Sequence, residues 1–169
     1  LLNHLLSFGI DNYWRRVLIK RVKKERVSNA LDIACGTGDL TISMAKLGIA
    51  TTGVDIASNM LDIANKKSAN KLAKYYSKKG SSITPPNYIC TSAHQLPFPN
   101  NHFDIATIGF GIRNFQNRGE SLLEIQRVLK PGGKLLIVEF ATPHNKLWRS
   151  IFNLYFLKIV PFIFRYGLR

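Results

Sequence analysis

The sequence predicts an α/β fold, a three-layer sandwich built on a mainly parallel sheet. Short apolar segments alternate with helical patterns, a glycine turn, Gly36-Thr37-Gly38, follows the first segment, and a lone acid, Asp55, ends the second. Strand, glycine turn, helix, strand and acid in this order form a nucleoside pocket at the carboxyl edge of a parallel sheet. The acid is placed to reach ribose hydroxyls, so the pattern predicts a ligand site together with the fold.

The composition is that of one globular domain. The chain has 169 residues, of which 46% are hydrophobic and 20% charged, enough for a single core. We therefore expect one domain over residues 1–169, with an N-terminal helical segment (1–28), a cofactor-binding core (29–143) and an aromatic, basic tail (144–169).

The N-terminal half of the chain carries the first predicted elements. Residues 1–26 have an amphipathic pattern that predicts one or two helices with a turn near residues 7–11. Residues 29–34 are a short apolar run stopped by the glycine turn, which predicts a buried strand. We expect Asp39 to cap the helix at residues 40–47.

The middle of the chain repeats this alternation. Residues 49–54 predict the second strand, and Ser58 is expected to cap a helix whose basic continuation through residues 66–80 is partly loop. Residues 81–86 are rich in Ser and Pro and predict a linker.

The remaining elements complete five predicted strands. Residues 88–91 and 103–109 predict the third and fourth strands, and residues 120–129 a helix. Lys130-Pro131-Gly132-Gly133 is expected to end that helix and turn into a fifth strand at residues 134–140. Strands and helices alternating at this spacing favour parallel βαβ units.

The charge and the tail suggest partners. The 24 Lys and Arg against 10 Asp and Glu give a net charge of +14, which favours nucleic acid or an anionic membrane, although solvated lysine faces would also account for it. The aromatic tail is too interrupted to span a bilayer. It would form an interfacial helix, a lid over an apolar substrate, or a helix packed on the sheet.

Metal and disulfide chemistry are not indicated. Cys35 and Cys90 are far apart, and neither they nor the four histidines have the spacing of a metal site. We therefore predict no metal.

The glycine turn discriminates among nucleoside ligands. A dinucleotide site would have a third glycine where this chain has Thr41, and no phosphate-binding lysine motif is present. S-adenosylmethionine remains, a sulfonium cation with a carboxylate and no phosphate. Gly36 and Gly38 would let the backbone approach its methionine part, helix amides near Asp39 would meet the carboxylate, and Asp55 would accept from both ribose hydroxyls.

Five stretches together resemble one family. They are Leu2–Asp11, the glycine motif, Leu96–Asn100, Phe110–Asn114 and Arg127–Gly133. The sequence is similar to the S-adenosylmethionine-dependent C-methyltransferases of ubiquinone and menaquinone biosynthesis, the UbiE/MenG type, in the class I methyltransferase superfamily. This resemblance implies a Rossmann-like sandwich. Because that superfamily has seven strands and five are predicted, we expect a chain that lacks the last two strands and is truncated at both ends.

The resemblance also implies site residues. The implied cofactor-binding residues are Asp32, Gly36, Thr37, Gly38, Asp55, Ser92, Ala93 and Gly109. Gly109 stands where some members have serine, and His94 where many have an acid. His94 would be a solvated polar residue or, alternatively, a catalytic base.

The implied reaction is methyl transfer to a ring carbon of a polyprenylated hydroquinone, either demethylmenaquinol or the benzoquinol precursor of ubiquinone. Arg113 and Asn114 are the expected catalytic residues, contacting the quinol oxygens. The alternative for Arg113 is a structural arginine that pairs with an acid such as Asp104 or with loop carbonyls.

The expected surroundings follow from the substrate. A polyprenyl quinol lies in the membrane, so we expect a cytoplasmic protein held peripherally at the inner face of the membrane, forming a homodimer and not binding nucleic acid. Two other functions stay open at this point. An RNA methyltransferase would account for the charge of +14, and a non-catalytic module would bind S-adenosylmethionine without turnover.

Overall fold

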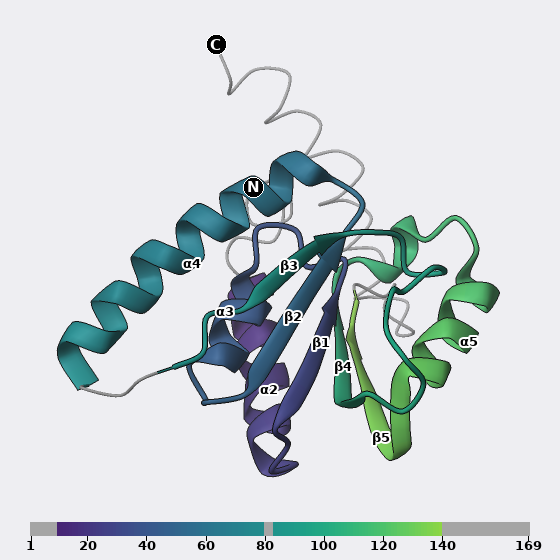
Figure 1. The fold of residues 1–169 in the computed structure, drawn as a ribbon, viewed down its shortest axis with the longest axis horizontal. Coiled ribbons are helices and arrows are strands. Elements are labelled where there is room, and N and C mark those ends of the chain that lie inside the picture. The colour runs from purple at the N-terminus through teal and green to yellow at the C-terminus, as the bar shows by residue number, and fades with distance from the viewer. Residues whose placement is uncertain (1–9, 80–82, 140–169) are drawn as a thin grey trace, which may run out of the picture. The chain divides into compact units, whose positions relative to one another are not determined.

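The computed structural model describes residues 10–79 and 83–139, and residues 11–139 form one compact unit. The expectations for the first nine residues and for the aromatic tail therefore lie outside the described residues. Within the described part, a single unit contains the sheet and the helices that cover it (Figure 1).

Five parallel strands form one sheet in the order β3-β2-β1-β4-β5. The strands are β1 (Asn29–Ile33), β2 (Ala50–Asp55), β3 (Asn87–Cys90), β4 (Phe103–Gly109) and β5 (Leu129–Val138). This confirms the predicted α/β fold and each predicted strand to within a few residues, apart from an earlier start of β5. From β1 the chain continues to β2 and β3 on one side of β1, whereas β4 and β5 lie on its other side. The strand order therefore reverses between β1 and β4.

The register brings the carboxyl ends of the strands to one edge. Ile33 pairs with Val54 and with Ile108, Asp55 pairs with Cys90, and Gly109 pairs with Val138. In an open parallel sheet, ligands bind outside this edge, at the point where the strand order reverses.

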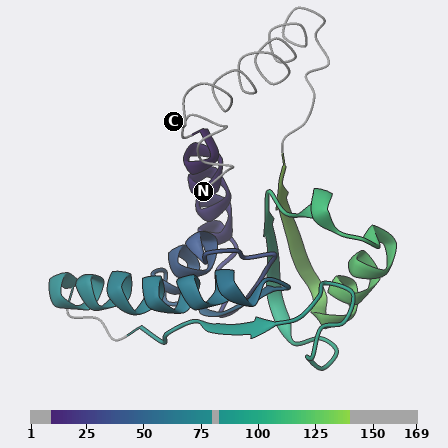
Figure 2. The same ribbon diagram turned by 90° about the horizontal axis from the view of Figure 1, so that it is seen from above.

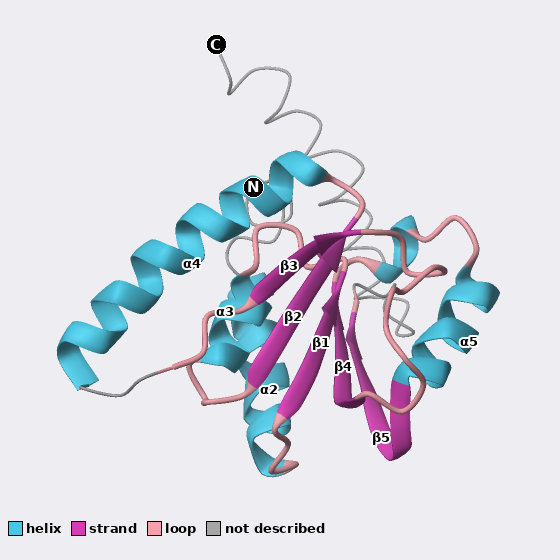
Figure 3. Ribbon diagram, viewed as in Figure 1, coloured by secondary structure: helices cyan, strands magenta, loops and turns pink. Residues whose placement is uncertain are grey.

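The helices divide between the two faces (Figures 2 and 3). They are α2 (Ile10–Lys24), α3 (Asp39–Ala45), α4 (Ser58–Lys79), the short 3-10 helix η1 (Ile112–Asn114) and α5 (Arg118–Val128). On one face, Leu18 of α2 and Leu40 of α3 pack against Ala30 and Ile105 of the sheet. In Figure 2, α5 lies on the other side of the sheet from α2 and α3.

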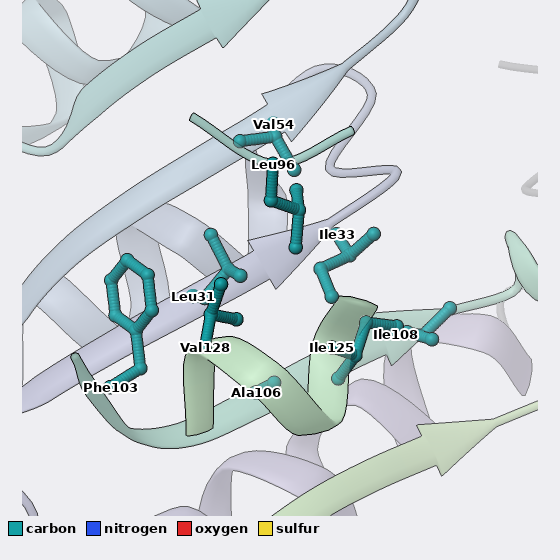
Figure 4. Packing of buried hydrophobic residues seen from close by; sticks show 9 residues of the cluster. All are labelled: Leu31, Ile33, Val54, Leu96, Phe103, Ala106, Ile108, Ile125 and Val128. Carbon is teal, nitrogen blue, oxygen red and sulfur yellow. The ribbon is translucent and has the colours of Figure 1, made fainter. Parts of the chain in front are cut away.

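The opposite face holds the second core cluster (Figure 4). Its members come from alternate positions of β1 and β4, from β2, from the loop after β3 and from α5, and they are Leu31, Ile33, Val54, Leu96, Phe103, Ala106, Ile108, Ile125 and Val128. Strands buried on both faces read as nearly continuous apolar runs, as residues 29–34 do. The two clusters hold the sheet rigid beneath the loops at its carboxyl edge.

Two helix predictions need correction. Asp39 does not cap α3 but is its first residue, because Gly38 occupies the cap position with φ +75° and makes no side-chain cap bond. The basic continuation of α4 is not partly loop, since the helix runs to Lys79. Leu72 is buried, and Tyr75 donates to the Lys46 carbonyl, so contacts with the rest of the domain hold this polar segment helical.

The turn at Lys130-Pro131-Gly132-Gly133 also differs from expectation. Strand β5 begins at Leu129, and its pairing with β4 shifts register between Phe103 and Ile105. The four residues therefore form an irregularity inside the strand pair instead of a turn before it. Gly132 has φ +78°, a conformation that glycine adopts at least cost.

Candidate cofactor and substrate site

The glycine turn is tied to the acid at the end of β2. The Gly36 amide, which follows β1, donates to Asp55 Oδ2 at 2.8 Å, and the Ala57 amide donates to Oδ1 at 3.0 Å. Each carboxylate oxygen can accept more than one hydrogen bond, so Asp55 keeps acceptor capacity for hydroxyls. Gly36 has φ +53°, and a Cβ built there would have nothing within 4 Å, so this side of the turn is open to a ligand.

The loop after β3 lies at the same edge. The Thr91 amide donates to the Asp55 carbonyl at 3.0 Å, which holds the loop against the end of β2. Ser92 follows, with its hydroxyl 3.4 Å from His94 Nε2, and Ala93 packs against the apolar cluster of Figure 4. The structure thus brings the glycine turn, Asp55 and the Ser92-Ala93 pair to one edge, and it leaves His94 exposed.

Asp32, one of the predicted cofactor-binding residues, is buried at the end of β1 beneath helix α3. It is 1% exposed, and its two carboxylate oxygens accept from Thr41 at 2.6 Å and from Thr107 at 2.8 Å. Burial raises its pKa to about 6, even though the two hydroxyl donors act in the opposite direction. Thr41, the residue in place of a third glycine, therefore joins α3 to β1 through Asp32.

Gly109 lies under helix α3. A Cβ at this position would approach Leu40 Cδ1 to 2.6 Å, closer than van der Waals contact allows. Packing against Leu40 therefore leaves little room for a side chain at Gly109.

A charged cluster borders the glycine turn. Lys67 Nζ of α4 lies 2.7 Å from Asp39 Oδ1 and donates to the Thr37 hydroxyl at 3.1 Å. Arg15 Nη1 of α2 lies 3.4 Å from Asp39 Oδ2, and Lys71 Nζ lies 3.6 Å from Oδ1. Burial alone would raise the Asp39 pKa, but the Lys67 hydrogen bond and the three positive charges lower it. Arg15 and Lys67 were not among the predicted site residues, because their elements lie far from the motif in sequence.

Arg113 and Asn114 lie in η1, directly after β4. The Arg113 guanidinium pairs with Glu139 at 2.8 Å, where β5 has just ended. The alternative for Arg113, pairing with an acid, is thus seen with Glu139 and not with Asp104, which binds Lys130 Nζ at 2.6 Å near the start of β4. Glu139 is a site residue that the sequence did not predict, because no motif spacing relates the end of β5 to η1.

A polar cavity of about 440 Å³ lies at the other edge of the sheet, near the start of β4. It is lined by residues that include Glu25, Ser28, Asp104, Lys130 and Lys134. Its acids are paired, Asp104 with Lys130 and Glu25 with Lys134, and the Lys130 hydrogen bond holds the Asp104 pKa well below its usual range. This cavity contains none of the predicted site residues. Within residues 10–79 and 83–139, no group of three or more His, Cys, Asp or Glu could hold a metal ion.

Solved structures share this fold. The YcgJ protein from Bacillus subtilis aligns with a TM-score of 0.62 and 23% identity, covering 84% of this chain and 56% of that one. A methyltransferase structure from Bacillus halodurans aligns with a TM-score of 0.61 and 24% identity, covering 81% and 55%. At these identities the likeness concerns the Rossmann-like fold alone, and it agrees with the predicted sandwich.

Curated relatives are more similar in sequence. The ubiquinone/menaquinone biosynthesis C-methyltransferase UbiE of Geotalea daltonii is 38% identical over 165 residues, covering 96% of this chain and 66% of the relative. The demethylmenaquinone methyltransferase of Chlorobaculum tepidum is 40% identical, covering 95% and 62%. This chain thus spans 62–66% of the length of these two relatives.

The family model gives the most extensive match. The model of the ubiE/COQ5 methyltransferase family matches residues 1–166, nearly the whole chain. This match includes the glycine turn, Asp55 and the segment around Arg113, which the structure gathers at the carboxyl edge of the sheet. The chain therefore belongs to the ubiE/COQ5 methyltransferase family.

Proposed function

We propose that the chain binds S-adenosylmethionine at the carboxyl edge of its sheet and methylates a ring carbon of a polyprenylated hydroquinone. The observation that carries this proposal is the juxtaposition of the Asp55-bound glycine turn with the Arg113–Glu139 pair at one edge. The printed names of the relatives, which include demethylmenaquinone methyltransferase and the ubiquinone/menaquinone enzyme UbiE, support this substrate class. Demethylmenaquinol and the benzoquinol precursor of ubiquinone are the two candidate substrates.

The residues around the turn fit the cofactor. The open side of Gly36 allows close approach of a ligand, and Asp55 retains acceptor capacity for two ribose hydroxyls. Ser92 and Ala93 would lie beside the adenine. When bound, the cofactor supplies an electrophilic methyl group on sulfur.

Arg113 and Asn114 would act on the quinol. A ring carbon becomes nucleophilic when a neighbouring phenol loses its proton, and a guanidinium beside the phenol favours the anion. Glu139 holds the Arg113 guanidinium at 2.8 Å, and Asn114, next in η1, would orient the oxygen. Alignment of carbon, methyl and sulfur without water would supply much of the rate, with effective molarities of order 10⁵ M or more.

We also propose that the protein works at the cytoplasmic face of a membrane. None of the helices within residues 10–79 and 83–139 combines the length and apolar character needed to cross a bilayer. Helix α2 exposes Tyr13 (61%), Trp14 (45%) and Val17 (37%) beside a series of exposed Lys and Arg residues. Exposed aromatics among basic residues are typical of helices that lie in a lipid interface.

Calorimetry with S-adenosylmethionine, followed by methyl-transfer assays on both quinols, tests the proposal. We expect Asp55→Asn to weaken cofactor binding by about tenfold or more, because a charged acceptor for the ribose is lost. The control is Asp62→Asn, an exposed acid on α4, which should leave the affinity unchanged. Salt-dependent methylation of RNA with no quinol product would overturn the proposed substrate, and binding without turnover of either quinol would favour a non-catalytic module.

A further inference from the structure

Arg15 lies where the strand order reverses. Its guanidinium reaches Asp39, which begins the helix after β1, at 3.4 Å, and its Cζ lies 5.7 Å from the ring centroid of Phe110, which follows β4. Helix α2 thus places one cation between the two loops that diverge from β1 and β4. Phe110 is 2% exposed and has φ +63°, an unfavourable conformation for a bulky residue and one that is often held at functional sites.

Part of this guanidinium has no hydrogen-bond acceptor. Arg15 Nε is buried and makes no hydrogen bond within the part of the chain that the structure describes. Asp11 Oδ2, its partner in an ion pair, is 3.7 Å away, beyond hydrogen-bond length. A buried N–H without an acceptor costs free energy, so a ligand that brings an acceptor to this edge would be favoured.

Three cations share one carboxylate beside the glycine turn. Arg15, Lys67 and Lys71 surround the carboxylate of Asp39, and the buried Asp11 adds one further negative charge. Lys67 also contacts the turn itself through the Thr37 hydroxyl at 3.1 Å.

We infer that Arg15 and Lys67 together receive the carboxylate of the methionine part of S-adenosylmethionine, while Asp39 holds the two cations in position. This inference rests on the proposed function and names the residues that recognise the amino-acid end of the cofactor. A carboxylate would supply the acceptor oxygen that Arg15 Nε lacks. Asp55 and the two cations would then bind opposite ends of one molecule.

Comparison of two ligands that differ by one carboxylate tests the assignment. We measure by calorimetry the affinities of S-adenosylmethionine and of decarboxylated S-adenosylmethionine for the full 169-residue chain. Arg15→Met should weaken binding of S-adenosylmethionine by about tenfold or more, as expected for a hydrogen bond between charged groups, and leave the decarboxylated ligand within about twofold. Lys67→Met should act in the same direction.

Two further variants serve as controls. Arg16→Met removes an exposed cation from the next position of α2 and should change neither affinity. Arg15→Lys keeps the charge and should lose less affinity than Arg15→Met, and thermal unfolding of each variant monitors its folding. Equal loss of both ligands in Arg15→Met, with wild-type binding intact, would overturn the carboxylate assignment alone. A wild-type chain that binds neither ligand would overturn the proposed function and this assignment with it.

Discussion

Arg113 and Glu139 follow neighbouring strands and form an ion pair of 2.8 Å at the edge of the sheet. If the guanidinium stabilises a phenolate, its loss should slow the chemical step and leave the affinity for the cofactor unchanged. We predict that Arg113→Ala lowers kcat for quinol methylation by about 100-fold or more, the effect of removing one oxyanion donor. The dissociation constant of S-adenosylmethionine should change by less than about threefold, as measured by calorimetry.

Glu139→Gln provides the companion variant. It keeps an acceptor for the Arg113 side chain but removes the negative charge, so kcat should fall less than in Arg113→Ala. A loss of cofactor affinity in Arg113→Ala comparable with the loss of kcat would contradict a role toward the substrate.

Asp32 makes stability depend on pH in a defined direction. Burial raises its folded-state pKa to about 6 from an ordinary value of 3.8. Between these two values the folded state holds a proton that the unfolded state releases, so the contribution of Asp32 to stability is fully present below pH 4 and falls as the pH rises to about 6. We predict that, from pH 4 to pH 8, the unfolding free energy of wild type falls by about 3 kcal/mol relative to Asp32→Asn.

Urea unfolding of both proteins at the two pH values measures this difference. Using Asp32→Asn as the reference cancels the other titrating groups, among them Asp104, whose lowered pKa acts with the opposite sign. A difference between the two proteins that does not vary with pH would show that Asp32 titrates normally in the folded chain.

At the scale of elements, the packing of α3 against β4 depends on a close contact between Leu40 and Gly109. A Cβ at Gly109 would lie 2.6 Å from Leu40 Cδ1, so Gly109→Ser should destabilise the fold by about 1–3 kcal/mol, the usual cost of overpacking. Shortening the partner with Leu40→Val should relieve part of that cost. In a double-mutant cycle measured by urea unfolding, the two changes together should cost less than the sum of the separate costs. Strict additivity would show that the cost of Gly109→Ser does not arise from contact with Leu40.

The elements that could be predicted are those with local signals. Strands β1 and β4 are apolar runs bounded by turns, and the glycine turn after β1 and the acid ending β2 have a fixed spacing. The length of α4 could not be predicted, because contacts such as that of Tyr75 with Lys46 are not visible in a polar helical pattern. The irregularity in β5 was missed for a similar reason, since Pro131 and the glycines indicate a turn but not the strand pairing around it.

The residues of the candidate site likewise include some that the sequence could predict and some that it could not. Gly36 and Asp55 could be predicted because consecutive strands of a parallel sheet place them at one edge, and the structure joins them by a hydrogen bond. Arg15 and Glu139 could not, since no spacing rule relates a helix before β1 or the end of β5 to the glycine turn. The contacts of Asp32 with Thr41 and Thr107 could not be predicted either, because a motif gives the position of a residue but not the direction of its side chain.

At the scale of the whole molecule, the net charge of +14 can be related to the face of the protein that would meet a membrane. Helix α2 carries the Arg15 side chain toward the site and exposes Tyr13 and Trp14, whose rings meet edge to face with centroids 5.5 Å apart. A membrane that receives this aromatic pair would hold the proposed site close to a quinol dissolved in the lipid. The long-range attraction of the basic chain to anionic lipid would bring the helix to the surface, and the aromatics would then insert.

Flotation with liposomes tests this arrangement. We predict that the double substitution Tyr13→Ser and Trp14→Ser lowers the partition coefficient onto anionic liposomes by about tenfold or more, since burial of two aromatic side chains in the interface is lost. The matched control is Leu122→Ser with Leu123→Ser, an exposed apolar pair on α5 (41% and 67% exposed) that lies beside acidic residues. Binding should weaken with added salt and on neutral lipid. Equal loss in both double variants, or binding indifferent to lipid charge, would contradict α2 as the membrane-facing helix.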